Sequence, residues 1–125
     1  EDLTIIAFSA MVPKALEAAE KLETEGINCT VIDPRTTSPL DEESIIASAE
    51  ETGRIVIVDE STPRCSIASD ISSIIVEKAF KSLKAPIRKV TTSHTPVPFS
   101  PALEQAYLPQ VDDILGACRE VLGSN

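Results

Sequence analysis

Two short runs of the chain are apolar at nearly every position, and they limit the possible folds more than any other feature. Residues 3–8 and residues 55–58 are rich in β-branched side chains and do not alternate apolar with polar positions. A strand with this pattern is buried on both faces, as strands of a parallel sheet are. The sequence therefore predicts a three-layer α/β/α fold with helices on both faces of a mostly parallel sheet.

Segments of helical periodicity separate four expected strands. The strands are expected at residues 3–8, 28–32, 55–58 and 87–90. Helices should begin near Pro13, near Leu40 and at Ile67, and a closing helix should begin at Val111. Strand and helix alternate four times, which predicts right-handed crossovers and places the functional loops at the carboxyl ends of the strands.

All four expected helices carry apolar side chains at helical spacing, and the first two are followed by a glycine. In the second helix these are Leu40, Ile45, Ile46 and Ala49, and in the closing helix Val111, Ile114, Leu115, Cys118, Val121 and Leu122. Gly26 and Gly53 follow the first and second helices, where glycine commonly caps a helix. The apolar side chains expected to face the core from the first and third helices are Leu16, Ala19, Leu22, Ile67, Ile71, Ile74, Ile75 and Phe80.

The start of the second helix can be placed in two ways. Ser38 could be the N-cap, because Pro39 then occupies the first helical position. Asp41 could instead cap the helix one turn later, followed by Glu42 and Glu43. Acidic residues suit the positive end of a helix in both cases.

Charge and cysteine content narrow the classes of function. The chain of 125 residues has a net charge of −9, which disfavours nucleic acid, since phosphate binding needs clustered Lys and Arg. The longest nearly apolar run, residues 5–12, is far shorter than the roughly 20 residues of a membrane helix. Cys29, Cys65 and Cys118 lack metal-ligand spacing and are interpreted as reduced thiols of a cytoplasmic protein, with only Cys65 placed to react.

The glycines give no support for a phosphate site. Gly26, Gly53, Gly116 and Gly123 are the only ones in the chain, and none lies in an expected strand-to-helix loop. Close approach of the backbone to a phosphate usually needs glycine. We therefore expect no nucleotide or dinucleotide site in this chain.

Polar side chains at the ends of two strands form the candidate site. Asp59 and Glu60 follow the third strand, but adjacent residues of an extended chain point to opposite sides and rarely converge. Asp33 and Arg35, one loop away, could bridge to them. This pattern favours a network that anchors loops, or the rim of an active site, over paired acid-base chemistry.

His94 is the only histidine and lies in a loop at the same expected edge of the sheet. A histidine there could be a general acid or base, and Asp59 could be its partner in a free-standing enzyme. No nucleophile or set of metal ligands accompanies it. A structural role is therefore the favoured interpretation.

The stretch Ile-Asp-Pro-Arg-Thr-Thr-Ser-Pro-Leu-Asp, residues 32–41, resembles the signature of the transketolase C-terminal domain. Residues 3–9, 53–60 and 96–109 are similar to further segments of that family, in the same order. The version in beta subunits of thiamine-diphosphate-dependent 2-oxo acid and acetoin dehydrogenases is the most similar. Residues 63–68 and 94–104 look most like the acetoin type, since pyruvate types usually carry a glycine-rich turn at residues 64–67 and an acid in place of His94.

This resemblance implies that different domains and subunits supply the cofactor site and the assembly contacts. In the family, the N-terminal domain of the beta subunit supplies the glutamate that activates the thiamine ring, and the alpha subunit supplies the diphosphate and metal site. The C-terminal domain packs across a twofold axis and helps dock the lipoyl acyltransferase core. The resemblance thus implies a structural and assembly domain, residues 1–125, of a longer beta subunit. By itself this domain should bind no thiamine diphosphate or Mg²⁺ and should be inactive.

The chain also departs from the family pattern in two respects. Pyruvate enzymes carry an acid before Ala-Pro that helps hold the acyltransferase, whereas here Lys84 precedes Ala85 and Pro86. Lys84 and Pro86 are therefore candidates for a different docking contact. The family fold also has an antiparallel edge strand before the position of Leu3, and we expect the sheet of residues 1–125 to lack it.

Two other assignments remain open at this point. One is the same domain of a pyruvate or branched-chain 2-oxo acid dehydrogenase. The more remote one is a receiver-like signalling domain with Asp59 as the acceptor, although its first strand would end at Phe8 and Ser9 without the required acid pair.

Overall fold

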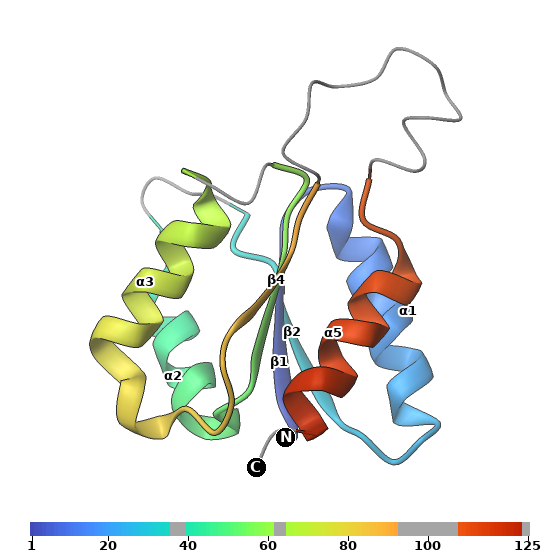
Figure 1. Ribbon diagram of the computed structural model, residues 1–125, viewed down its shortest axis with the longest axis horizontal. Helices are drawn as coiled ribbons and strands as arrows, with labels where there is room; N and C mark the ends of the chain where they lie inside the picture. Colours follow the sequence, from blue (N-terminus) through green and yellow to red (C-terminus); the bar gives the residue numbers. More distant parts are fainter. Residues whose placement is uncertain (36–39, 62–64, 93–107, 124–125) are drawn as a thin grey trace.

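The computed structural model describes residues 1–35, 40–61, 65–92 and 108–123. Four parallel strands form a sheet between two layers of helices (Figure 1), as expected from the uninterrupted apolar runs. The elements in chain order are β1 (Leu3–Ala7), α1 (Met11–Glu23), β2 (Cys29–Ile32), α2 (Glu42–Thr52), β3 (Ile55–Val58), α3 (Ile67–Ala79), the 3-10 helix η1 (Phe80–Ser82), β4 (Arg88–Val90) and α5 (Val111–Gly123).

The strand order is β2-β1-β3-β4, and every pairing is parallel. Each residue of the central strands β1 and β3 is buried, whereas β2 is half-buried throughout and β4 is exposed at Arg88 and Lys89. The uninterrupted apolar runs therefore mark the two strands that have a neighbour on each side. Within the described ranges, no antiparallel edge strand is present.

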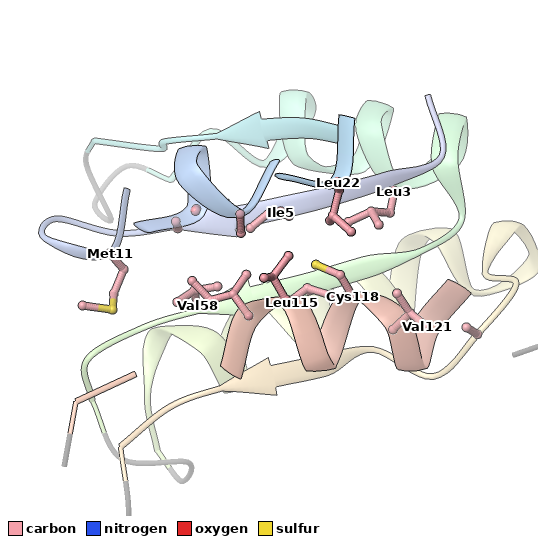
Figure 2. Packing of buried hydrophobic residues seen from close by; sticks show 14 residues of the cluster. Leu3, Ile5, Met11, Leu22, Val58, Leu115, Cys118 and Val121 are labelled. Carbon is pink, nitrogen blue, oxygen red and sulfur yellow. The ribbon is translucent and has the colours of Figure 1, made fainter. Parts of the chain in front are cut away.

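The sheet separates two hydrophobic cores. Leu3, Ile5 and Val58 point to one face, where α1 and α5 cover them. Figure 2 shows side chains of these helices, Leu22 and Leu115 among them, gathered against the sheet. Ile6, Ile55 and Ile57, which alternate with them along β1 and β3, point to the other face and pack against α2 and α3. Burial on both sides explains why β1 and β3 contain few polar positions.

Helix α1 turns a different face to the sheet from the predicted one. Its buried residues are Met11, Ala15, Ala18 and Leu22, whereas Leu16 is 48% exposed. The prediction that Leu16 faces the core was therefore wrong. The small alanines at positions 15 and 18 face the sheet instead, following the spacing set by Met11 and Leu22.

Helix α3 ends one residue before Phe80, and the predicted burial of Phe80 was also wrong. The chain tightens into η1 at this point, and the Phe80 side chain is 68% exposed. The buried face of α3 runs instead through Ala68, Ile71, Ile75 and Ala79. Phe80 lies four positions after the exposed Val76, so even a continuous helix would place it on the outer side of the buried face.

Both ends of α2 have clear caps. Asp41 is the N-cap, and its Oδ1 accepts a hydrogen bond of 3.2 Å from the backbone N–H of Ser44. Of the two predicted starts, the structure therefore supports the later one; Ser38 lies outside the described residues. Gly53 is the C-cap in the left-handed conformation, as predicted, and Gly26 also has positive φ after α1.

Candidate functional site

The carboxyl ends of the strands lie at the top of the sheet in Figure 1, and the predicted polar residues within the described ranges follow β2 and β3. Asp33 follows β2 and Asp59 follows β3. Because all four strands are parallel, these ends meet at one edge, where loops of α/β folds usually carry function.

Asp59 anchors the turn that follows β3. It is 8% exposed, and the hydroxyl of Ser61 donates a hydrogen bond to its Oδ2. Its backbone N–H donates to the carbonyl of Val90 at 3.0 Å, and both the N–H and the hydroxyl of Thr92 donate to the carbonyl of Ser61. These bonds join the turn to the end of β4. Glu60 is exposed, whereas Asp59 is buried.

Asp33 and Arg35 interact with each other. The backbone N–H of Arg35 donates to Asp33 Oδ1 at 3.0 Å, and Arg35 Nε lies 3.9 Å from Asp33 Oδ2. The Arg35 side chain is 88% exposed, so this ion pair contributes little to stability. Arg35 also has φ of +62°, and the Asx-type bond within its own loop holds it there.

The structure does not join the two pairs into one network. Strand β1 lies between β2 and β3, which separates Asp33 from Asp59 by two strand spacings, roughly 9.6 Å. No hydrogen bond or ion pair connects them within the described part of the chain. His94 lies outside the described residues. The role of these residues as an active-site rim stays a prediction.

The described residues do not fit a diphosphate with its metal ion. Among them, no three His, Cys, Asp or Glu side chains are grouped as metal ligands would be. The glycines at 26 and 53 follow helices, and Gly116 and Gly123 lie within α5, so none opens a phosphate loop. In the same ranges, no helix combines the length and apolar character required to cross a membrane.

The three cysteines differ in accessibility. Burial is the main reason why the pKa of Cys118 rises to about 12, and burial together with Asp2 raises the pKa of Cys29 to about 11. Cys65 is exposed and has φ of +49° before α3. Thiolate chemistry is therefore disfavoured at Cys29 and Cys118, and Cys65 is the accessible thiol, as predicted.

Lys84 and Pro86 lie at the opposite end of the sheet, in the connection from η1 to β4. The backbone N–H of Lys84 donates to the carbonyl of Gly53 at 2.8 Å, which fastens this connection to the end of α2. Ala85 is buried, whereas Lys84 and Pro86 are exposed. Their part in docking stays a prediction.

A groove of about 610 Å³ beside this connection was missed by sequence reasoning. Its lining residues are Ser72, Val76, Phe80, Lys81, Leu83, Ala85, Pro86 and Ile87. Val76 and Phe80 are exposed apolar residues four positions apart. The sequence did contain a sign of this groove, because α3 carries more apolar residues than one buried face requires.

Comparison with known proteins gives one consistent assignment. The family described as transketolase, C-terminal domain, matches residues 1–114. The chain is 51% identical over 122 residues to the beta subunit of acetoin:2,6-dichlorophenolindophenol oxidoreductase from Bacillus subtilis, and 48% identical over 122 residues to that of Cupriavidus necator. It is 45% identical over 121 residues to the beta subunit of the pyruvate dehydrogenase E1 component from Bacillus subtilis.

These matches cover 97–98% of this chain, which spans only 36–37% of the length of the three relatives.

A solved structure supports the same assignment. A split gene transketolase, described as an inactive beta4 tetramer, superposes with a TM-score of 0.82 at 32% identity. The match covers 97% of this chain and 38% of that one. A 2-oxoglutarate:ferredoxin oxidoreductase from Magnetococcus marinus shares the fold, with a TM-score of 0.66 at 15% identity. The family match leaves no support for a receiver-like domain, and the chain belongs to the transketolase C-terminal domain family.

Proposed function

We propose that this chain is the C-terminal structural and subunit-assembly domain of the beta subunit of a thiamine-diphosphate-dependent acetoin dehydrogenase. The observation that carries the proposal is the order of the identities. Two acetoin oxidoreductase beta subunits match at 51% and 48%, ahead of the pyruvate dehydrogenase beta subunit of Bacillus subtilis at 45%.

The chemistry of the whole enzyme follows from the family resemblance. The enzyme would cleave acetoin oxidatively and transfer a two-carbon unit to the lipoyl arm of an acyltransferase. Thiamine diphosphate and Mg²⁺ would be held by the alpha subunit and by the N-terminal domain of the beta subunit. The domain by itself would then bind neither group and would be inactive.

The proposed partners are a second beta subunit, an alpha subunit and the lipoyl acyltransferase. The beta4 assembly named for the solved relative supports the first of these. Residues 1–125 would form one domain, with Lys84 and Pro86 as candidates for docking. Asp33, Arg35, Asp59, Glu60 and His94 would contribute to the loop network or active-site rim. We propose a cytoplasmic location.

The substrate can be tested in the complete beta subunit combined with its alpha subunit. Reduction of 2,6-dichlorophenolindophenol would be followed with acetoin, pyruvate and a branched-chain 2-oxo acid. The proposal expects a kcat/KM for acetoin that exceeds the others by about tenfold or more. A preference for pyruvate or the branched-chain acid would assign the chain to the corresponding dehydrogenase and overturn the acetoin proposal.

A further inference from the structure

Lys14 occupies a position that helix stability by itself does not favour. It is the fourth residue of α1, whose first turn contains no acidic residue. The N-terminus of a helix is its positive end, so a lysine there is electrostatically unfavourable. Within the described ranges, no carboxylate forms an ion pair with its ammonium group. Departures from local rules of this kind occur mainly at functional sites.

The Lys14 ammonium binds the chain at the point where it enters α5. Its Nζ donates to the carbonyl of Pro109 at 2.7 Å and to Oε1 of Gln110 at 3.4 Å. Pro109 is buried, and Lys14 is half-buried. A charged donor makes a stronger hydrogen bond than a neutral one. Lys14 therefore joins the start of α1 to the start of α5.

Two further hydrogen bonds fix the same short segment, residues 108–110. The Gln110 side chain donates through Nε2 to the carbonyl of Leu108 at 3.2 Å. The backbone N–H of Gln110 donates to Asp113 Oδ2 at 2.8 Å, which is the returning half of a capping box. The place where the connection from β4 reaches α5 is thus held from both sides, by α1 and by α5.

The other end of this connection is held at Thr92, which is buried. Its backbone N–H and its hydroxyl donate to the carbonyl of Ser61 at 3.1 and 2.9 Å, and the hydroxyl of Ser61 donates to Asp59. In Figure 1, β4 ends at the same edge of the sheet at which α1 and α5 begin. Both attachment points therefore lie at the carboxyl edge, where the active-site rim is proposed.

We propose that Lys14 is a positioning residue for this rim, because it fixes one end of the connection from β4 to α5 while Asp59 and Thr92 fix the other. Lys14 acts through Pro109 and Gln110 and does not contact substrate. The inference rests on the proposed function and adds to the rim a residue that the sequence pattern did not indicate. Since a rim surrounds the reacting atoms and does not include them, Lys14 should affect KM more than kcat.

Steady-state kinetics of the complete beta subunit with its alpha subunit test the proposal. Lys14→Met removes the ammonium group and should raise KM about tenfold, while kcat changes less than about threefold. Lys14→Arg can still donate to the carbonyl of Pro109 and should keep KM within about threefold of the wild-type value. Lys21→Met is the matched control, because Lys21 also lies on α1 but pairs only with Glu17, at 3.4 Å. It should leave KM unchanged.

A double-mutant cycle tests whether Lys14 and Thr92 hold the same connection. Thr92→Val removes the hydroxyl that donates to Ser61. If the two residues hold one connection, releasing either end frees it, and the double variant should raise KM about tenfold, as each single variant does. Independent effects would multiply to about 100-fold and would contradict the proposal.

Hydrogen exchange in the 125-residue chain gives a measurement that does not depend on any substrate. The amides of residues 110–113 should exchange at least about tenfold faster in Lys14→Met than in the wild type, and at the wild-type rate in Lys21→Met. Urea denaturation of each variant confirms that the rest of the fold is retained.

Several outcomes would overturn the inference. Unchanged exchange or an unchanged KM in Lys14→Met would do so, as would an equal rise of KM in Lys21→Met or in Lys14→Arg. Each variant is compared with the wild type on the substrate that the wild type prefers. A preference for pyruvate would therefore reject the acetoin proposal and still leave the role of Lys14 open to the same test.

Discussion

Gly53 lies where the connection from α2 to β3 packs against the connection from η1 to β4, and a Cβ does not fit between them. It has φ of +68°, and a Cβ added there would lie 2.5 Å from the carbonyl oxygen of Ser82 and 2.9 Å from Cγ of Lys84. We expect Gly53→Ala to lower the free energy of unfolding by about 1–3 kcal/mol, because backbone strain and overlap act together. Urea denaturation at equilibrium measures this change.

Gly116→Ala is the matched control for Gly53→Ala. Gly116 lies inside α5, and a Cβ there would meet no atom within 4 Å. Alanine should therefore raise the free energy of unfolding by about 0.5–1 kcal/mol through helix propensity. If Gly53→Ala stabilised the chain as Gly116→Ala does, the close packing described at Gly53 would be wrong.

Some single-residue features could be predicted from the sequence and others could not. The glycine cap at position 53 was predictable because few residues accept positive φ. The buried hydroxyl cluster was not: Thr4 Oγ1 lies 2.7 Å from Ser48 Oγ and 2.9 Å from Thr52 Oγ1. Nothing in the order of residues 4, 48 and 52 indicates that β1 and α2 bring them together.

The same limit applies to the candidate site. Asp59 could be placed at a strand end from the sequence, but its backbone bond to the carbonyl of Val90 and the bonds from Thr92 to Ser61 could not. That contact exists only because β3 and β4 are neighbours in the sheet.

At the scale of the element, the start of α2 depends on a charged cap. Hydrogen bonds from the side chain and then the backbone of Ser44 hold the pKa of Asp41 below the usual aspartate value. The folded state thus favours the charged carboxylate. Its contribution to stability is complete above the unfolded-state pKa of about 3.9 and is lost as the pH falls through the lower folded-state value.

We expect Asp41→Asn to reveal this dependence. Asparagine can still cap the helix but does not ionise. The difference in urea midpoint between wild type and Asp41→Asn should therefore be larger at about pH 6 than at about pH 3. Glu43→Gln in the same first turn is the control, since Glu43 has no hydrogen bond or ion pair with a described residue and should show a smaller change. A difference for Asp41→Asn that is equal at both pH values would contradict the assigned cap.

Strands were predicted more accurately than helix faces, for a physical reason. Burial on both sides forces every residue of β3 to be apolar, so Ile55–Val58 was predicted at its observed bounds. A helix needs only one buried stripe, and Ala15 and Ala18 fit against the sheet where Leu16 was expected. Hydrophobicity by itself does not report how closely a helix approaches its sheet.

For the whole molecule, two surfaces lie at opposite ends of the parallel sheet. The polar loops lie at the carboxyl ends of the strands, whereas the groove lined by Val76, Phe80 and Pro86 lies beside the connection into β4 at the other end. Alternation of strands and helices predicted the first surface through a general rule of α/β folds. The second groups Val76 of α3 with Phe80 and Pro86 of the connection into β4, and helical periodicity does not show that these segments meet.

The central claim is that this chain assembles subunits and leaves the cofactor to the rest of the enzyme. Isothermal titration calorimetry of thiamine diphosphate with Mg²⁺ into the 125-residue chain tests it most directly, with the complete beta subunit plus alpha subunit as the positive control. We predict saturable binding for the complete enzyme and no saturable heat for the 125-residue chain. Saturable micromolar binding by the chain itself would contradict the account.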